Sequence, residues 1–260
     1  MIHHTAIISS KYKIDKSNYI GPYCVIGDNV KIGKNNKLIS HVSIIGNTNI
    51  ENNNTFYPFC SIGSDPQDLK FKNENSFLEI GNNNKFRENV TVNPGTIGGG
   101  LKTIIKNNCL FMVGSHIAHD CIISSNVILA NNATLAGHVE IHENAILGGN
   151  SAVHQFVRIG KFAMIGGMSG VEKDIIPYGL YLGIRENLKG INIIGLKRKG
   201  LDSISINKIN KTLKNIFDNK NTILKNIDNL KLEKNIVEII EIIKFIKNDS
   251  KRGLCFLDNE

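Results

Sequence analysis

No run of 18 or more apolar residues occurs in this 260-residue sequence, and its beginning, MIHHTAIISSKYK, lacks the charged-then-apolar order of a signal peptide. We therefore expect a cytoplasmic protein that does not insert into a membrane. The sequence also lacks a basic stripe interleaved with aromatic residues, so nucleic acid is not an expected partner. The formal net charge of +8 suggests acidic partners, although Lys and Asn are abundant throughout and a biased nucleotide composition is the favoured explanation.

Nucleotide-phosphate loops are missing as well. The segment NPGTIGGGLKT, at positions 93–103, is rich in glycine but has neither the GxGxxG nor the GxxxxGK[ST] spacing. No helical pattern follows it directly. A dinucleotide or P-loop phosphate site is therefore not expected there.

What the sequence does contain is an apolar residue at every sixth position. From Ile105 to Val171 all twelve such positions are apolar, which has a chance of roughly two in a hundred thousand when 41% of residues are hydrophobic. Six steps along a helix rotate a side chain by about 240°, whereas six steps along a strand return it to the same face. Small residues such as Ser115, Ala133 and Ala145 lie two positions before these anchors, on the same inward face.

This period predicts a solenoid. Three six-residue sides form an 18-residue coil, and successive coils stack at the strand spacing of about 4.8 Å as a parallel β-helix. The spacing alone leaves the handedness of the β-helix open. Gly, Asn and Asp are frequent between the anchors, as expected for corners that need a tight or left-handed backbone.

The same period runs from Ile2 to Ile62 and is interrupted twice. The polar stretch 64–79 leaves the repeat, which resumes in phase at Ile80, and the glycine-rich stretch 93–103 shifts the register by one residue. We expect both stretches to be loops at corners of the solenoid. Such loops commonly carry function, with a solvated decoration as the alternative.

The spacing of apolar residues becomes helical from Leu188 onward. In the last helical segment, isoleucines recur at spacings of three and four, which predicts one apolar stripe along a helix. They are Ile236, Ile239, Ile240, Ile243 and Ile246. The predicted organisation is a β-helix over 1–187, with loops at 64–79 and 93–103, followed by a small helical domain over 188–260. Such a domain can cover the open end of the solenoid.

The cysteines fit this scheme as packing residues. Cys24, Cys60, Cys109 and Cys121 each lie two positions before an anchor, where a small inward group is needed. We expect them to be buried and reduced rather than disulfide partners or metal ligands. Cys255, in the tail, is expected to be inert.

Histidines gather in one part of the repeat. Residues 18 apart lie above one another in such a coil, so His119, Gly137 and Gln155 form one column and Asp120, His138 and Phe156 the next. This patch suits acyl transfer, because an imidazole can accept a proton from an attacking hydroxyl, a carboxylate can orient it, and a glycine N–H can face the developing oxyanion.

Two alternatives exist for this patch. The polar residues can be ordinary exposed groups between anchors, or His116, His119 and His138 can bind zinc. The zinc site is disfavoured because no nearby acidic or cysteine pattern favours zinc over a general base. His3, His4, His41 and His142 are expected on the surface or at corners.

The whole chain resembles the acyl-carrier-protein:UDP-N-acetylglucosamine O-acyltransferases that begin lipid A synthesis. The motifs that carry the resemblance are QDLK (67–70), HIAHD (116–120), NNATLAGHV (131–139), AVHQF (152–156), GGMSGV (166–171) and GLKRKG (195–200). The hexapeptide repeats alone indicate only a large superfamily. The combination of HIAHD, LAGHV, AVHQF and a helical tail is far more specific.

The resemblance implies a left-handed β-helix and a homotrimer with active sites between neighbouring chains. It implies that His119 is the general base on the sugar 3-hydroxyl, that Asp120 orients it, and that the Gly137 N–H is the oxyanion donor. The residues that the resemblance assigns to substrate binding are Asp68, Lys70, His116, His138, His154, Gln155, Gly167, Asn192 and Arg198.

Within that set, Asp68 and Lys70 are implied to contact the nucleotide-sugar across the interface, and Asn192 and Arg198 to reach its UDP portion. Gly167 resembles the residue that limits acyl length, and implies a long (3R)-hydroxyacyl chain. Met164 and Met168 nearby can shorten the groove. No metal and no bound cofactor are implied, because the donor thioester hangs from the phosphopantetheine arm of an acidic acyl carrier protein.

Three positions depart from the family pattern: Ile194 replaces a carboxylate, Lys199 an arginine, and Arg185 a histidine. Three other functions remain as alternatives. A related hexapeptide N-acyltransferase would carry an additional N-terminal uridine-binding domain, whereas the anchors here start at Ile2. The others are a zinc lyase of the γ-carbonic-anhydrase type, which metal analysis would detect, and a scaffold that only binds carrier protein.

Overall fold

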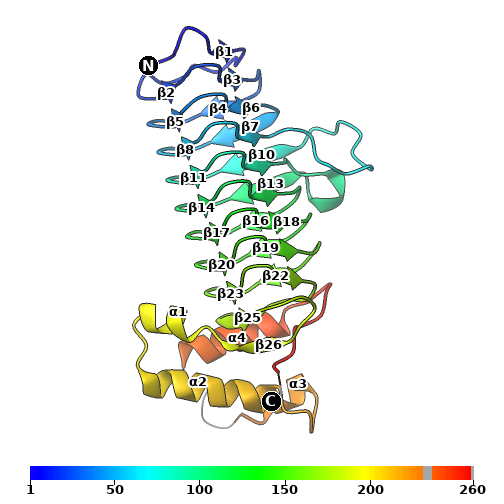
Figure 1. Ribbon diagram of the computed structural model, residues 1–260. Helices are drawn as coiled ribbons and strands as arrows, with labels where there is room; N and C mark the ends of the chain where they lie inside the picture. Colours follow the sequence, from blue (N-terminus) through cyan, green and yellow to red (C-terminus); the bar gives the residue numbers. More distant parts are fainter. Residues whose placement is uncertain (231–235, 259–260) are drawn as a thin grey trace.

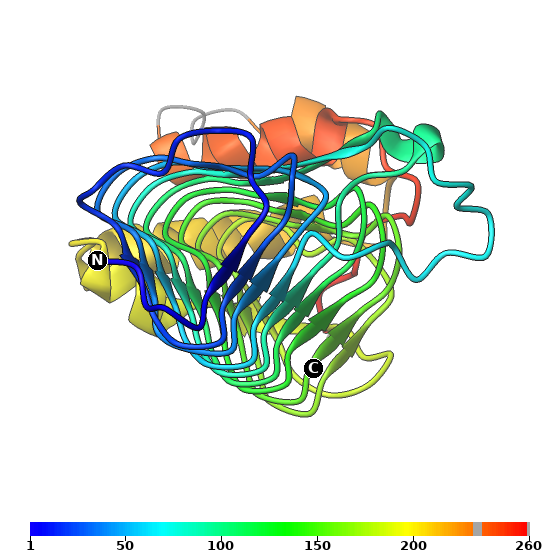
Figure 2. The ribbon, with the colours of Figure 1, turned by 90° about the horizontal axis from the view of Figure 1, so that it is seen from above.

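The computed structural model describes residues 1–230 and 236–258, and within them the strands form three parallel-stranded faces of a left-handed β-helix (Figure 1). Viewed along its axis, the solenoid has a triangular cross-section (Figure 2). Consecutive strands belong to different faces, and each pairs with the strand one coil away. In the part without insertions this distance is 18 residues, as in the pairing of Ile104 with Ile122. The predicted fold class and coil length are confirmed.

The three faces differ in length within the described residues. The first has nine strands: β1 (Ile7–Ile8), β3 (Val25–Ile26), β6 (Ser43–Ile44), β9 (Ser61–Ile62), β12 (Thr91–Val92), β15 (His116–Ile117), β18 (Thr134–Leu135), β21 (Ala152–Val153) and β24 (Gly170–Val171). The second has seven: β4 (Lys31–Ile32), β7 (Asn47–Ile50), β10 (Phe77–Ile80), β13 (Lys102–Ile105), β16 (Ile122–Ile123), β19 (Glu140–Ile141) and β22 (Arg158–Ile159).

The third face has ten strands in the same described ranges. They are β2 (Tyr19–Ile20), β5 (Lys37–Leu38), β8 (Thr55–Phe56), β11 (Lys85–Phe86), β14 (Leu110–Phe111), β17 (Ile128–Leu129), β20 (Ile146–Leu147), β23 (Met164–Ile165), β25 (Gly179–Tyr181) and β26 (Leu188–Ile191). The last pair, β25 and β26, is antiparallel. This reversal ends the solenoid, because β26 leads directly into the helical region.

The core is a ladder of the predicted anchors. All twelve anchors from Ile105 to Val171 are buried, and so are the small residues two positions before them. Cys24, Cys60, Cys109 and Cys121 are buried and free, as predicted. The first anchor differs, because Ile2 is 52% exposed. Within the described residues, Ile2 pairs only with Ile20 in the following coil, so its side chain has packing partners on one side only.

The two interruptions are corner loops whose lengths explain their register. Asn47 pairs with Phe77 and Phe77 with Lys102, so these coils contain 30 and 25 residues instead of 18. The first insertion is thus two full repeats and preserves the phase, whereas the second is one repeat plus one residue. The loops are slightly shorter than predicted, since β10 begins at Phe77 and β13 at Lys102. The second loop contains a single 3₁₀ turn, η1 (Ile97–Gly99).

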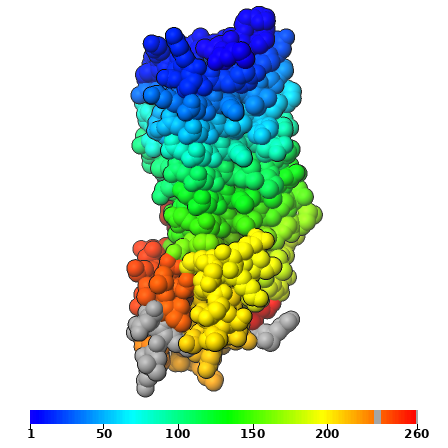
Figure 3. All heavy atoms as spheres, turned by 90° about the vertical axis from the view of Figure 1, so that its left-hand side faces the viewer, coloured from blue at the N-terminus to red at the C-terminus, as the bar shows by residue number. Residues whose placement is uncertain are grey.

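Four helices are present among the described residues: α1 (Ile193–Arg198), α2 (Ser203–Ile216), α3 (Ile223–Asp228) and α4 (Val237–Lys247). They lie at the C-terminal end of the solenoid (Figure 3). The helical region begins later than predicted, because Leu188–Ile191 is a strand. Within these helices, none is both long and apolar enough to cross a membrane.

The predicted apolar stripe of α4 is partly wrong. Ile239 and Ile246 are buried, but Ile242 and Phe245 are the other large apolar residues buried with them. The predicted residues Ile236 and Ile243 are half-buried and pack against the core, whereas Ile240 is half-buried and is not among the core residues described. The helix is apolar on more than one side, so spacing alone did not separate Ile240 from the residues that pack against the core.

Polar contacts join α4 to the last coil. Glu241 pairs with Lys161 and accepts a hydrogen bond from the hydroxyl of Tyr178. Lys199 Nζ lies 2.6 Å from a carboxylate oxygen of Glu238 and 3.1 Å from the same Tyr178 hydroxyl. Burial and the nearby Glu241 raise the pKa of Tyr178, so this hydroxyl stays protonated and available as a donor.

Candidate active site

The candidate site lies at the corner between the nine-stranded and seven-stranded faces. His119 and Asp120 follow β15, and Gly137 and His138 follow β18 one coil later. The His138 N–H donates to the His119 carbonyl at 2.9 Å, and the Phe156 N–H donates to the Gly137 carbonyl at 3.2 Å. The two columns predicted from the 18-residue period are therefore present.

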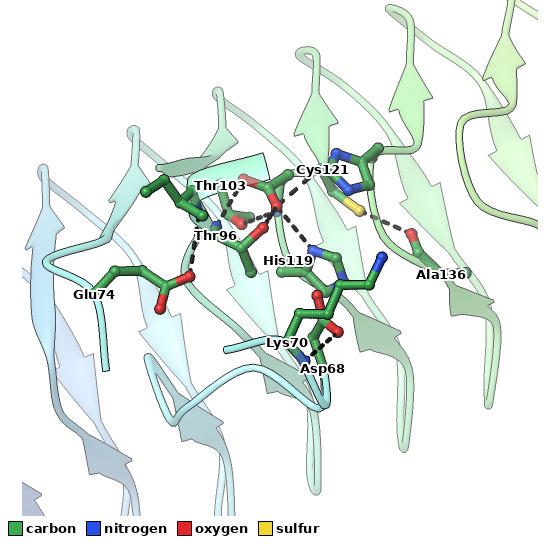
Figure 4. Close-up of polar contacts among 11 residues, drawn as sticks. Asp68, Lys70, Glu74, Thr96, Thr103, His119, Cys121 and Ala136 are labelled. Carbon is green, nitrogen blue, oxygen red and sulfur yellow. Dashed lines mark hydrogen bonds and ion pairs between the residues drawn. The ribbon is translucent and has the colours of Figure 1, made fainter. Parts of the chain in front are cut away.

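His119 and Asp120 form a buried pair (Figure 4). His119 Nδ1 lies 2.8 Å from Asp120 Oδ2, and the exposed fractions of the two side chains are only 8% and 0%. An ionised carboxylate can only accept hydrogen bonds, so Nδ1 carries the proton. This leaves the His119 Nε2 lone pair free to accept a proton from a substrate.

Asp120 is held by a second set of donors from the glycine-rich loop. Thr96 donates its backbone N–H to Oδ1 at 2.8 Å and its hydroxyl to Oδ2 at 2.6 Å. The Asp120 backbone N–H donates in turn to Thr103 Oγ1 at 2.8 Å. Burial alone would raise the pKa of Asp120, but the hydrogen bonds from His119 and Thr96 outweigh it and lower the pKa below its ordinary value.

Gly137 leaves space for the imidazole of His119. A Cβ atom at Gly137 would lie 2.4 Å from Cε1 of His119 and 2.6 Å from Nε2, closer than real contacts allow. Gly137 is itself buried, and its backbone N–H has no hydrogen-bond partner within the described ranges. An unpaired donor beside the proposed base is suited to a developing oxyanion.

Two further histidines border the pair. His116 Nδ1 lies 2.7 Å from Thr91 Oγ1, and burial lowers the pKa of His116, with His119 as a second cause. His138 stacks on the ring of Phe156 at 4.3 Å between centroids, and its Nδ1 is 3.9 Å from Asp120 Oδ2. Burial is also the main cause that lowers the pKa of His138. Both imidazoles are therefore neutral at neutral pH and can accept or donate hydrogen bonds.

The first loop brings Asp68 and Lys70 to the same corner. In Figure 4 both side chains extend from the loop toward the part of the chain that carries His119. Asp68 is close enough for its charge to raise the pKa of His138 against the effect of burial. Asp68 Oδ1 accepts the Lys70 backbone N–H at 3.0 Å in a short turn, where Asp68 is half-buried and Lys70 is exposed.

The other predicted residues lie farther out. Gln155, the last member of the first column, and the neighbouring His154 are exposed, and Gly167 is exposed at a corner of the ten-stranded face. Asn192 caps α1, because its Oδ1 accepts the Gly195 N–H at 2.9 Å and its Nδ2 donates to the Phe162 carbonyl. A structural role for Asn192 is thus visible in the single chain.

Arg198 and Asn192 line a groove of about 590 Å³ on the outer side of the ten-stranded face. Its floor is apolar, formed by Ile128, Ile146 and Met164. Within one chain, this groove and the His119 corner belong to different faces of the prism. A single chain therefore does not bring Asn192 and Arg198 together with the His119 pair.

The structure shows the contacts of the three residues that depart from the family pattern. Ile194 lines the groove and is 65% exposed. Lys199 also lines it, while pairing with Glu238, and Arg185 pairs with Glu172 at 2.9 Å. Two of the three side chains therefore border the same groove as Arg198.

One group of side chains among the described residues has ligand atoms close enough for a metal ion: His119, Asp120 and His138 lie within 4.8 Å of one another. This is not the trio considered from the sequence, because His116 is bound to Thr91 instead. Asp120 Oδ2 already accepts hydrogen bonds from Thr96 and His119. The Asp120 carboxylate is therefore satisfied by hydrogen bonds from protein donors.

Thr91, Thr96 and Thr103 were not predicted from the sequence. Thr103 lies two positions before the anchor Ile105, but the repeat gave it only a packing role, and Thr96 lies in a loop that departs from the repeat. The available signal was the glycine-rich loop itself. This loop returns to the solenoid beside the columns, where its residue Thr96 binds Asp120.

Two protein-family models match segments of this chain. Residues 174–255 match the model described as UDP N-acetylglucosamine O-acyltransferase, domain 2, and residues 102–137 match the bacterial transferase hexapeptide repeats.

Curated relatives match over almost the full length. The acyl-[acyl-carrier-protein]–UDP-N-acetylglucosamine O-acyltransferase of Thermodesulfovibrio yellowstonii is 49% identical over 255 residues, which cover 98% of each chain. The enzyme of the same name from Rickettsia canadensis is 47% identical, over 99% of this chain and 98% of its own.

Solved structures agree with these matches. The UDP-N-acetylglucosamine acyltransferase of Francisella novicida superposes with a TM-score of 0.93 at 37% identity, covering 100% of this chain and 95% of that one. The corresponding Arabidopsis enzyme gives a TM-score of 0.84 at 32% identity, covering 98% and 100%.

Proposed function

This chain belongs to the family of acyl-[acyl-carrier-protein]–UDP-N-acetylglucosamine O-acyltransferases, and we propose how it carries out that transfer. The acyl group is a (3R)-hydroxyacyl chain, the acceptor is the 3-hydroxyl of the sugar, and the reaction is the first step of lipid A biosynthesis. The observation that carries the mechanism is the buried pair of His119 and Asp120, with a free imidazole nitrogen beside the unpaired Gly137 N–H.

His119 acts as the general base. Its Nε2 accepts the proton of the sugar 3-hydroxyl while the hydroxyl oxygen attacks the thioester carbonyl carbon. The Gly137 N–H stabilises the negative charge that develops on the carbonyl oxygen. When the tetrahedral intermediate collapses, the C–S bond breaks and His119 returns its proton to the sulfur of the phosphopantetheine arm. Asp120 stabilises the imidazolium between these two transfers.

The acyl group passes directly from donor to acceptor, without an acyl-enzyme. A covalent route would need a reactive nucleophile at the site, and the nearest cysteine, Cys121, is buried. Burial raises the pKa of Cys121 to about 12, so its thiol is not ionised at neutral pH. No metal or bound cofactor takes part, because the thioester already supplies an activated acyl group.

Residues at the His119 corner bind the acceptor and the reacting part of the donor. Asp68 and Lys70 contact the nucleotide-sugar, and His116, His138, His154 and Gln155 line the substrates. The groove beside Arg198 contributes to nucleotide and acyl binding, and its apolar floor supports an acyl chain. Gly167 leaves the end of the acyl path open. The net charge of +8 supports docking of an acidic carrier protein.

The active protein is a homotrimer. The His119 corner and the groove with Asn192 and Arg198 lie on different faces of one prism. Packing three chains around a threefold axis places the groove of one chain beside the corner of the next. Both halves of a complete site are then present at each interface.

Product analysis tests the proposed reaction. Purified protein is given UDP-N-acetylglucosamine with a panel of 3-hydroxyacyl carrier proteins, and the product is measured by mass. We expect a mono-acylated sugar nucleotide that mild alkali hydrolyses, as an ester does and an amide does not, and no product from the 3-deoxy acceptor.

Two controls distinguish the alternatives. Intact-protein mass after incubation with acyl donor alone should show no acyl adduct. Metal analysis should show no stoichiometric zinc. Alkali-stable product would indicate N-acylation, and zinc at one ion per site would contradict the transferase mechanism.

A further inference from the structure

The glycine-rich loop 93–103 has no role in the mechanism so far, although it lies directly against the catalytic pair. It leaves the solenoid after β12 and returns at β13, at the corner that carries Asp120 (Figure 4). Gly99, in its 3₁₀ turn, approaches the carboxylate so closely that a Cβ atom there would lie 2.0 Å from Asp120 Cγ. The loop therefore forms a cover over Asp120.

Thr96 is the residue of this loop that binds the carboxylate. Its N–H and its hydroxyl donate to the two different oxygens of Asp120, at 2.8 and 2.6 Å. Thr96 is only 4% exposed. The Thr96 carbonyl accepts the N–H groups of Gly99 and Leu101, which fixes the residue within the loop.

The carboxylate has two imidazoles within reach. Asp120 Oδ2 lies 2.8 Å from His119 Nδ1 but also 3.9 Å from His138 Nδ1. A rotation of the carboxylate toward His138 would release His119, whose Nδ1 would then lose the acceptor that selects its tautomer. Two donors from Thr96, one on each oxygen, oppose such a rotation.

We propose that Thr96 is a positioning residue, which holds Asp120 in the orientation that fixes the tautomer of His119. Thr96 does not touch the reacting atoms, and its effect on the reaction passes through Asp120. This inference rests on the proposed function only for its effect on turnover, since the tautomer of His119 is measurable without substrate.

The loop is also tied to the first loop. Asn93 Nδ2 donates to the carbonyls of Ser64 and Asp65 at 3.0 and 3.1 Å. The Ile97 N–H donates to Glu74 at 3.2 Å. The two loops thus support each other, so the position of Thr96 depends on contacts from both sides.

The test compares Thr96→Val with Thr96→Ser. Valine replaces the hydroxyl with a methyl group of similar size and keeps the backbone N–H, whereas serine retains the hydroxyl. Thr48→Val is the matched control, because Thr48 is also buried and its hydroxyl donates a 2.6 Å bond, to Ile45, away from the catalytic pair.

For Thr96→Val we expect kcat to fall at least tenfold with KM for both substrates changed less than about twofold, and for Thr96→Ser and Thr48→Val we expect kcat within about threefold of wild type. In ¹⁵N-histidine NMR of the full-length protein, the Nδ1–H tautomer of His119 should be well defined in wild type and Thr96→Ser and should be mixed in Thr96→Val.

Unchanged kcat in Thr96→Val, equal defects in both Thr96 variants, or an unchanged His119 tautomer would overturn the positioning role. Failure of the proposed function would look different. Wild type would then make no ester product at all, while the NMR comparison would still report whether Thr96 determines the tautomer.

Discussion

At the scale of single residues, the position of the His119 imidazole, the proposed general base, requires glycine at position 137. The imidazole of His119 lies where a Cβ atom of residue 137 would be, at 2.4 Å from Cε1. We predict that Gly137→Ala displaces the imidazole and lowers kcat at least a hundredfold, of the order seen when a general base is lost. The thermal midpoint should also fall, since the displaced ring leaves the buried Asp120 carboxylate without one of its donors.

Gly98→Ala is the matched control for this prediction. Its nearest neighbour, Thr96 Oγ1, is 4.0 Å from the added Cβ position, so the methyl group has room at the same corner. Steady-state kinetics should give near wild-type turnover for this variant. Equal turnover in both alanine variants would show that the contact with His119 does not limit the reaction.

Asp120 makes stability depend on pH in the acid range. Hydrogen bonds from His119 and Thr96 lower its pKa in the folded protein below the ordinary 3.8, despite burial. A carboxyl with a lowered folded-state pKa contributes stability above its unfolded pKa and loses that contribution as pH falls through the folded value. We predict that wild type loses its stability advantage over Asp120→Asn below about pH 4.

Denaturant unfolding at fixed protein concentration between pH 7 and pH 3 measures this effect. The difference in unfolding free energy between wild type and Asp120→Asn should be constant near neutral pH and should shrink at the acid end. A difference that grows as pH falls would contradict the assigned ionisation of Asp120.

The residues of the site were predictable to different degrees. His119, Gly137 and His138 follow from stacking at 18-residue intervals, because the period alone determines which residues share a corner. Thr96 was not predictable, because a loop that departs from the repeat has no period to place it. The N-cap role of Asn192 was missed for a similar reason, since it depends on the exact start of α1.

At the scale of elements, a ladder of buried asparagines stabilises the early coils. Asn54 Oδ1 accepts the Asn84 N–H at 2.9 Å, and Asn54 Nδ2 donates to the Gly81 carbonyl at 2.8 Å. Asn36 and Asn84 repeat this pattern above and below. Each side chain thus replaces a backbone partner at a corner where neighbouring coils cannot pair directly.

We predict that Asn54→Ala destabilises the protein by about 2 to 4 kcal/mol, because it leaves a buried N–H and a buried carbonyl unpaired. The exposed Asn49 in β7 is the control, and its replacement by alanine should cost less than about 0.5 kcal/mol. Urea unfolding of both variants measures the difference. Equal stability would show that the ladder adds nothing beyond the strand pairing.

The elements were predicted well where the repeat is regular. Twelve successive anchors fall on buried positions because a strand returns to the same face every second residue. The helical region was predicted less well. In β26 the apolar residues Leu188 and Ile191 are three positions apart, which is also the spacing of an apolar pair on one face of a helix. In α4, Ile is so frequent that several faces satisfy the helical period.

At the scale of the whole molecule, the two halves of the proposed site lie on different faces of one prism. His119 is at one corner, and Arg198 borders the groove on another face. The proposed homotrimer would join the two, and it predicts a particle of three 28.8 kDa chains in sedimentation. The sequence alone suggests a trimer only through the family resemblance, because no repeat position reveals which exterior face is covered.

Mixing two inactive variants tests whether the site is shared. His119→Ala and Arg198→Ala should each be weakly active alone, but co-refolded mixtures form trimers in which one interface has both native residues. At equal amounts about a quarter of interfaces are complete, so about a quarter of wild-type turnover should return. A mixture no more active than its components would contradict a site formed by two chains.

The measurement that tests the central claim most directly is turnover by His119→Ala with UDP-N-acetylglucosamine and the best 3-hydroxyacyl carrier protein. His4→Ala, an exposed histidine in the first coil, serves as the control. We predict that kcat falls at least a hundredfold for His119→Ala and stays at the wild-type level for His4→Ala, with the acceptor KM little changed in both. If His119→Ala retained more than about a tenth of wild-type turnover, His119 would not be the general base.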